Sequence, residues 1–306
     1  MKDSEIRELV RAGFDLHVHV GPDILPRKYT ARKLVEEEKG KIRGLGLKAH
    51  SFPTISAINA TKAEIQTDLV MVGSITLNYF MGGFNPSAVY ASAVLSPDLP
   101  VIVSFPTVHA ENHLRKNYSA YEIPPEWVKD PRFVPRKKHE LKAIKVTDWN
   151  NRLFGKCMRV LDMAKRMNCI VATGHLSWEE ARELALVALG MELKVIVTHP
   201  YQKDIDMPVE VQKELAEKGA RIEHCYIMYL DRDHKWDYPP DEIADLIRAV
   251  GPQHCILTSD TGQLRNPSPS ECIFEFVKLL QKEGVAREDF EKMIIENPAA
   301  LLGLDR

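Results

Sequence analysis

The sequence predicts an α/β protein built as a (β/α)8 barrel of the TIM type, a single domain over residues 1–306 with a long insertion after the fourth strand. Three observations predict this class. Short runs rich in β-branched residues alternate with helical segments, eight such runs are present, and most follow one another at about 24 to 35 residues, the length of a βαβ repeat. A six-stranded doubly wound sheet is the alternative.

The expected strands are residues 14–19, 45–51, 69–78, 100–105, 169–175, 194–199, 220–225 and 255–260. Helical periodicity follows several of them, as in ARKLVEEEKGK, WEEARELALVALGM, VEVQKELAEKG and SECIFEFVKLLQKEG. We expect the first dozen residues to form a short helix that covers the barrel bottom. The closing segment EDFEKMIIENPAALLGL is expected to form one or two helices.

The spacing between the fourth and fifth strands is too long for one βαβ repeat, so residues 107–148 are predicted to be an insertion. Its prolines and its basic stretch PRFVPRKKH favour an irregular excursion over a second compact domain. Because it leaves from a strand end, we expect it to lie over the active-site face of the barrel as a lid. Its aromatic residues allow a second interpretation, a homo-oligomer interface built on Tyr118, Tyr121, Trp127 and Phe133.

Composition narrows the functional class. The chain is 44% hydrophobic and carries a formal charge of -2, which is typical of a folded globular protein. Because no basic stripe is present, nucleic acid is not an expected partner. No apolar run reaches the length of a membrane span, and the charged N-terminus lacks a signal peptide's apolar centre, so we expect a cytoplasmic protein. Five cysteines without a CxxC pair indicate neither a disulfide framework nor a cysteine zinc site.

Histidine and aspartate residues stand at the ends of four expected strands. His17 and His19 are two apart on the first, so both rings point to the same side. His175, His199 and Asp260 end three later apolar runs. Because parallel strands of a barrel end at one mouth, these side chains are predicted to share a metal ion. His199 precedes a proline, and a plain turn residue is its alternative role.

With this pattern and the closing ENPAALLGL, nearly the whole chain resembles the amidohydrolase superfamily of metal-dependent barrel hydrolases. The resemblance implies that His17, His19 and Asp260 bind one metal ion, that His175 and His199 bind a second or complete the first, and that Asp260 is the general base. The chain departs from the family at the fourth strand. Many members carry a carboxylated lysine there, whereas PVIVSFPTVHAENH has no lysine.

Other residues could take the role of the missing lysine or contact the substrate. Lys48 and His50 share a face of the second strand, where Lys48 could be carboxylated or bind a substrate anion, or could simply be solvated. Glu111, beside His109, resembles the bridging carboxylate of TatD-type nucleases. His224 could face the mouth, although a core position is favoured. Substrate contacts are expected in two loops, at Asn78, Gly82, Gly83 and Asn85 and at Thr261 and Gln263.

The ligand set favours one or two Zn²⁺ ions, with Mn²⁺, Fe²⁺ or Ni²⁺ as alternatives. The sequence therefore predicts a hydrolase that cleaves a C–N or C–O bond of a small molecule, such as an amide, a cyclic amide or a lactone, with Asp260 and Lys48 as catalytic residues. Three alternatives remain: a TatD-like phosphoester hydrolase, a nonoxidative decarboxylase and a non-catalytic barrel that binds a metal or a ligand.

Overall fold

A computed structural model describes residues 1–118, 143–230 and 235–305. Within these ranges every paired strand runs parallel to its neighbours, in two sheets of order β1-β2-β3 and β4-β5-β6-β7-β8-β9. The strands are β1 Phe14–His19, β2 Gly44–Lys48, β3 Val70–Val72, β4 Ser74–Thr76, β5 Ile102–Ser104, β6 Ile170–Ala172, β7 Lys194–Val197, β8 Arg221–Cys225 and β9 Cys255–Thr258. The expected third strand is thus divided in two at Gly73.

The two sheets close into one barrel. Gly73 joins β3 directly to β4, and its carbonyl oxygen accepts a hydrogen bond of 3.0 Å from Ile102 on β5. At the other seam the first strand meets the segment after β9, because the amide of His19 donates to Thr261 (2.7 Å) and the amide of Asp260 donates to His17 (2.9 Å). The barrel prediction is therefore confirmed, and the doubly wound alternative is wrong.

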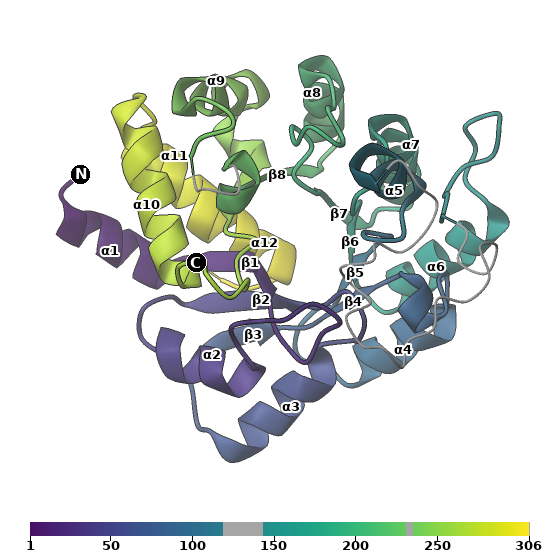
Figure 1. The fold of residues 1–306 in the computed structure, drawn as a ribbon, viewed down its shortest axis with the longest axis horizontal. Coiled ribbons are helices and arrows are strands. Elements are labelled where there is room, and N and C mark those ends of the chain that lie inside the picture. The colour runs from purple at the N-terminus through teal and green to yellow at the C-terminus, as the bar shows by residue number, and fades with distance from the viewer. Residues whose placement is uncertain (119–142, 231–234, 306) are drawn as a thin grey trace.

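Helices surround the strands (Figure 1). Most of them follow a strand, as the alternating pattern predicts, and most bury apolar side chains in the layer between helices and strands. They are α1 Asp3–Ala12, α2 Ala31–Glu38, α3 Ile55–Glu64, α4 Pro86–Val94, α5 Glu111–Tyr118, α6 Gly155–Arg166, α7 Trp178–Gly190, α8 Val209–Glu217, α9 Pro240–Val250, α10 Pro269–Lys282, α11 Arg287–Glu291 and α12 Asn297–Leu302, with a π-helical turn at Lys292–Glu296 and short 3-10 turns at Tyr79–Met81, Tyr226–Tyr229 and Pro252–His254.

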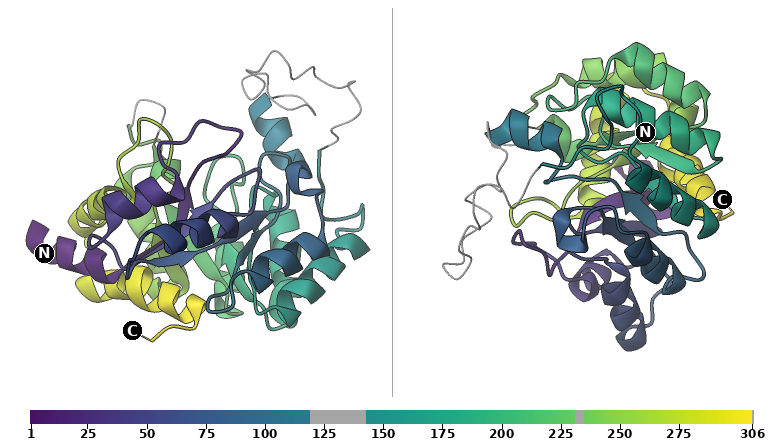
Figure 2. Two further views of the ribbon diagram at one scale, coloured as in Figure 1. Left: turned by 90° about the horizontal axis from the view of Figure 1, so that it is seen from below. Right: turned by 90° about the vertical axis from the view of Figure 1, so that its right-hand side faces the viewer.

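The first helix does not cover the barrel bottom. α1 packs along α10, where Arg7 forms a bidentate ion pair with Glu271 (2.6 and 2.7 Å), and Figure 2 shows these two segments side by side. The bottom is closed by α12 instead, since Leu301 and Leu302 pack against Phe14 and other side chains inside the barrel. The expected helices are present, but the carboxyl-terminal helix, and not the first one, closes the bottom of the barrel.

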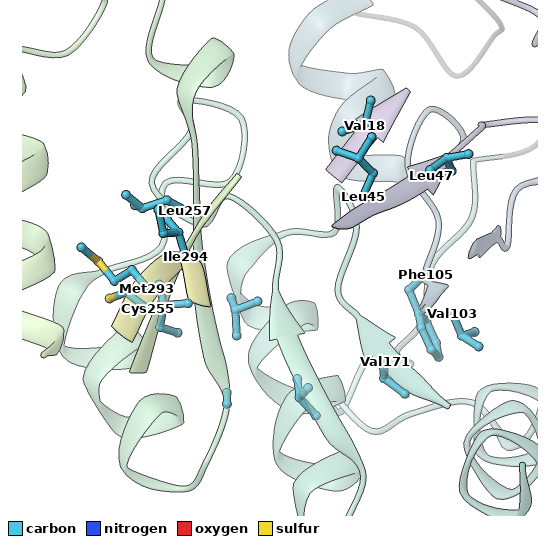
Figure 3. Close-up of a cluster of buried hydrophobic side chains, with 14 of the residues drawn as sticks. Val18, Leu45, Leu47, Val103, Phe105, Val171, Cys255, Leu257, Met293 and Ile294 are labelled. Carbon is cyan, nitrogen blue, oxygen red and sulfur yellow. The ribbon is translucent and has the colours of Figure 1, made fainter. Parts of the chain in front are cut away.

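Strand side chains alternate between two buried layers. The inner layer fills the barrel and consists of Phe14, Leu16, Val72, Ile102, Ile170, Ala172, Ile196 and Ile256. The outer layer lies between strands and helices (Figure 3) and includes Val18, Leu45, Leu47, Val103, Phe105, Val171, Leu257, Met293 and Ile294. Burial on both faces explains why the strands read as continuous apolar runs.

The described flanks of the insertion meet at one point. The amide of Ile144 donates to His109 (2.7 Å), and the amide of Glu111 donates back to Ile144 (3.0 Å), so the chain leaves and returns side by side. Residues 119–142 lie outside the described residues, and so do most of the predicted lid and three aromatic residues of the possible interface, Tyr121, Trp127 and Phe133. The five cysteines are buried and unpaired. No described helix is long and apolar enough to cross a membrane.

Candidate metal centre

A bulge in β1 turns the two histidines into the barrel. Asp15 pairs with Leu45, but Val18 pairs with Leu47, so β1 has one residue more than β2 over this stretch. As a result Leu16 and His17, although adjacent, line the same interior cavity, while Val18 packs outward. Without the extra residue, Phe14 and His17 would face opposite sides of the sheet.

The structure brings the five expected metal ligands together at the carboxyl end of the barrel. Ring centroids are 5.4 Å apart for His17 and His19, 6.1 Å for His17 and His199, and 5.1 Å for His175 and His199. Oδ1 of Asp260 lies 3.0 Å from Nε2 of His19 and 3.3 Å from Nε2 of His17. The mouth therefore holds a compact set of four imidazoles and one carboxylate.

Backbone geometry at two of these residues is unusual. His199 has φ 26° and Asp260 has φ 53°, both in the left-handed region that residues other than glycine rarely adopt. Each follows the last residues of a strand, so the turn redirects the side chain toward the cluster. Such conformations cost about 1–3 kcal/mol each and persist where surrounding contacts impose them, often at functional sites.

The donor atoms of this set fit a divalent cation. Both ring nitrogens of His199, Nδ1 of His175 and Nδ1 of His19 are buried and have no hydrogen-bond partner among the described residues. A buried polar atom without a hydrogen-bond partner costs about 1–3 kcal/mol, so these ring nitrogens are expected to bind a ligand. Burial lowers the pKa of His199 to about 4 and the pKa values of His19 and His175 well below their usual range. These rings are neutral at pH 7, the state that binds a metal ion.

Lys48 is buried in the same cluster. Its Nζ lies 3.0 Å from Nε2 of His17, and burial lowers its pKa. A small cavity of about 20 Å³, enough for one water molecule, lies inside the barrel beside it and is also lined by Ser104, Thr198 and Glu223. The lysine thus faces the barrel interior and is not a solvated strand end.

Sequence reasoning missed Glu223. Its Oε1 lies 3.2 Å from Nδ1 of His17 and accepts a hydrogen bond of 3.1 Å from Thr258. Burial raises the pKa of Glu223, but His17, with help from His199 and Lys48, outweighs this effect and lowers it to about 2. The sequence does contain a signal for Glu223, since it places a carboxylate in the middle of an apolar strand. Burying a carboxylate costs free energy unless it has a partner, so a partner inside the barrel could have been expected. Cys225, two residues further, shares this face, with Sγ 3.7 Å from Nδ1 of His17.

The structure separates the remaining histidine candidates. His50 lies in the mouth, with its ring centroid 4.7 Å from that of His19 and its Nδ1 3.0 Å from Oγ1 of Thr107. His109 is held by the loop after β4, where its Nδ1 accepts from the amide of Tyr79 (3.1 Å). His224 points to the outer layer, with Nδ1 2.6 Å from the hydroxyl of Tyr229.

Glu111 is not brought to the cluster. It begins α5 and forms ion pairs with Arg115 (3.3 Å) and Lys145 (3.5 Å) at a surface pocket. The chain after β5 enters a turn at Thr107, whose carbonyl oxygen accepts from the amide of Ala110 (2.9 Å). Glu111, the residue that sequence spacing suggested as a bridging ligand, therefore lies outside the cluster of imidazoles. Among its described residues, this segment therefore places no carboxylate among the imidazoles.

The residues that were expected to contact substrate mainly form hydrogen bonds with other residues of the loops around the mouth. Asn78 accepts from the amide of Thr107 (3.0 Å) and donates to the carbonyl of His50 (3.1 Å). Asn85 caps α4, while Gly82 and Gly83 adopt positive φ in the preceding turn. Thr261 donates to Pro267 (2.8 Å), and Gln263 donates to the carbonyl of Asp260 (3.1 Å). These residues shape the loops around the mouth.

A second carboxylate stands beside the imidazoles. Asp23, in the loop after β1, has a carboxylate oxygen within 4.8 Å of ring nitrogens of His19 and His50. It also forms a buried ion pair with Arg27, whose Nη2 lies 3.1 Å from Oδ2 of Asp23. Sequence reasoning missed both residues, because nothing in the loop's composition separates them from ordinary surface charges.

Known proteins share this fold. A sequence search finds no match among curated proteins. An amidohydrolase from Pseudomonas aeruginosa is 13% identical, with 98% of each chain covered and a TM-score of 0.60. The probable dipeptidase PvdM from Pseudomonas aeruginosa is 12% identical, covering 98% of this chain and 96% of that one, with a TM-score of 0.60. A phosphotriesterase from Mycobacterium tuberculosis is 11% identical, covering 96% and 94%, with a TM-score of 0.54.

At these identities the likeness shows the fold, and it confirms at that level the resemblance to the amidohydrolase superfamily. A family model described as a family of unknown function, DUF6282, matches residues 12–223, a span that begins just before β1 and ends within β8. His17, His19, His175 and His199 fall inside this span, and Asp260 follows it. The chain belongs to the DUF6282 family.

Proposed function

We propose that this protein is a metal-dependent hydrolase that cleaves a C–N or C–O bond of a small molecule, such as an amide, a cyclic amide or a lactone. One observation carries the proposal. Four histidines converge with Asp260 at the barrel mouth, and three of them have buried ring nitrogens that lack a partner among the described residues. The names of structurally similar proteins, an amidohydrolase, a probable dipeptidase and a phosphotriesterase, support hydrolysis.

His17, His19, His175, His199 and Asp260 would hold one or two ions, and Zn²⁺ suits this ligand set best. When bound, such an ion lowers the pKa of water toward about 7 and polarises the scissile group. Asp260, whose Oδ1 reaches both His17 and His19, takes the proton from the attacking water and returns it to the leaving nitrogen or oxygen. Lys48, beside His17, supplies a second donor at the reacting centre.

Phosphoester hydrolysis of the TatD type is less well supported. That alternative depended on Glu111 as a bridging ligand, and Glu111 is paired with Arg115 and Lys145 outside the cluster. Nonoxidative decarboxylation and a non-catalytic binding role have no observation of their own in their favour. They are outcomes of the experiment that follows.

The experiment measures metal content and turnover together. We expect purified protein to carry one to two equivalents of divalent metal, and His17→Ala, His19→Ala and Asp260→Ala each to lower that content, because a cage without one ligand is weaker. His254→Ala is the matched control, since His254 precedes β9 at the opposite end of the barrel. Full loading of all three variants would disprove the site. A loaded wild type that turns over no amide, lactone, ester or phosphoester favours nonoxidative decarboxylation if it releases CO2 from a carboxylic acid, and the non-catalytic role if it does not.

A further inference from the structure

A buried arginine stands at the rim of the metal centre. Arg27 lies in the loop between β1 and α2, and only 3% of its side chain is exposed. Its Nε and Nη2 both donate to the same oxygen, Oδ2 of Asp23, at 3.2 and 3.1 Å. A charged group this deep is costly unless it is paired, so the loop has been built around this ion pair.

Asp23 is held in place by the neighbouring strand end. Its Oδ1 accepts from the hydroxyl of Ser51 (2.6 Å) and the amide of Ile24 (2.9 Å), and its Oδ2 accepts from the amide of His50 (3.2 Å). The carboxylate is therefore fully used and serves as a fixed support for Arg27. With a guanidinium already bound to it, Asp23 is a poor candidate for a metal ligand.

The same contacts place the guanidinium beside the proposed metal ligands. The Asp23 carboxylate that binds Arg27 has an oxygen within 4.8 Å of ring nitrogens of His19 and His50. The charge of Arg27 also acts on this cluster: it adds to burial, the main cause, in lowering the pKa values of His19 and His50. Arg27 thus faces the same mouth as Asp260.

Most of the donor capacity of Arg27 remains unused. A guanidinium carries more N–H groups, in a planar fork, than two bonds to one oxygen require. Among the described residues, Asp23 is the one acceptor that Arg27 contacts, and Nη1 contacts none. A buried cation with spare, preoriented donors next to a reaction centre matches the geometry in which carboxylates and phosphates bind by two parallel hydrogen bonds.

We propose that Arg27 binds an anionic group, a carboxylate or a phosphate, of the small molecule that enters the barrel mouth. Its role as a substrate contact rests on the proposed function, whereas anion binding itself does not. The substrate is then an acidic compound whose charged end is held by Arg27 and whose scissile bond lies over the imidazole cluster. Asp23 is the positioning residue, and Arg27 is the residue that contacts the ligand.

The test uses the full-length protein and two probes, inorganic phosphate and succinate, titrated by calorimetry against sodium chloride at matched ionic strength. We expect wild type to bind at least one probe, and the stronger one identifies the source of the anion. Arg27→Gln should weaken binding about 10-fold or more, because two charge-assisted hydrogen bonds are lost. Arg182→Gln is the matched control, since its bidentate pair with Glu214 (2.7 and 2.7 Å) lies on α7 and α8.

Two further variants keep the test decisive if Arg27→Gln unfolds. Asp23→Asn/Arg27→Gln removes both charges and leaves neither unpaired. Arg27→Lys keeps a cation on Asp23 but not the planar fork, so it should bind less tightly than wild type. Repeating the titration after chelation distinguishes anion binding at Arg27 from anion binding to a metal ion, because binding at Arg27 persists without metal. Equal affinity in wild type and all Arg27 variants, or no binding beyond the chloride control, would overturn it.

Discussion

Glu223 and His17 are paired through the ring nitrogen that faces away from Asp260. Oε1 of Glu223 lies 3.2 Å from Nδ1 of His17, whereas Nε2 of the same ring faces Oδ1 of Asp260 at 3.3 Å. A carboxylate on one nitrogen holds the proton there and directs the lone pair of the other nitrogen to the ligand position. Glu223 therefore orients His17 from outside the ligand set.

We predict that Glu223→Ala lowers metal affinity by about 10–100-fold, the range found when such a partner of a ligating histidine is removed. Glu223→Gln retains an acceptor oxygen for Nδ1 and should lose less. A competition titration with a chromophoric chelator measures both. Glu180→Ala is the control, because Glu180 is also buried but accepts from the amide of Val146 (2.9 Å), away from the mouth. Unchanged affinity in Glu223→Ala would show that His17 needs no such partner.

Lys48 is predicted to matter more for turnover than for stability. Lys48→Met keeps a long unbranched side chain but removes the nitrogen that lies 3.0 Å from His17. We expect turnover to fall by at least about 10²-fold, as for loss of a donor at the reacting centre, with little change in the urea midpoint. Lys194→Met is the control, since Lys194 is half-buried at the opposite end of the barrel and donates to Leu301 (2.8 Å). Equal turnover in the two variants would remove Lys48 from the reaction.

His224 is predicted to make the fold sensitive to acid. Burial lowers its pKa to about 4, while the unfolded value is about 6.5. Between these two pH values the His224 ring is protonated in the unfolded chain but not in the folded chain. Its contribution to the free energy of unfolding is therefore complete above about pH 6.5 and is lost as pH falls through about 4. The loss approaches roughly 3 kcal/mol at the limit.

Urea unfolding between pH 4 and 7.5 in the presence of a chelator measures this effect. His224→Gln should lose stability at every pH, because Tyr229 loses a partner, but its stability should fall less steeply with acid than that of wild type. His254→Gln, at a half-buried position, should alter the slope less. Metal content should stay at the wild-type level in His224→Gln. Parallel curves for wild type and His224→Gln would contradict the assignment.

Gly46 is predicted to be needed for the bulge in β1. A Cβ at this position would lie 2.3 Å from the carbonyl oxygen of Leu16, so Gly46→Ala must displace the backbone next to His17. We expect a loss of about 1–3 kcal/mol in the free energy of unfolding and lower metal content. Gly190→Ala, at the end of α7, meets nothing within 4 Å and should be neutral or stabilising by up to about 1 kcal/mol. Full metal loading in Gly46→Ala would show that the bulge tolerates the change.

The sequence by itself determined the barrel and the place where the main candidate ligands meet. Runs of β-branched residues alternating with helices indicate parallel strands, and the carboxyl ends of parallel strands meet at one mouth. His175, His199 and Asp260 could therefore be assigned to one place without knowing any contact, because strand direction alone brings them together. The prediction that α1 covers the bottom was wrong, since helical periodicity shows an apolar face but not the surface that will cover it.

Tertiary structure decided which neighbours of these residues join the site. Side chains alternate along a strand, so one extra residue in β1 changes the face on which His17 lies, and the backbone of Leu16 approaches Gly46 so closely that a side chain there would have no room. The same alternation puts Glu223 inside the barrel and His224 outside. The pair of Asp23 and Arg27 depends on a loop folding onto the end of another strand. Each of these outcomes follows from contacts between residues far apart in the chain, which local pattern does not encode.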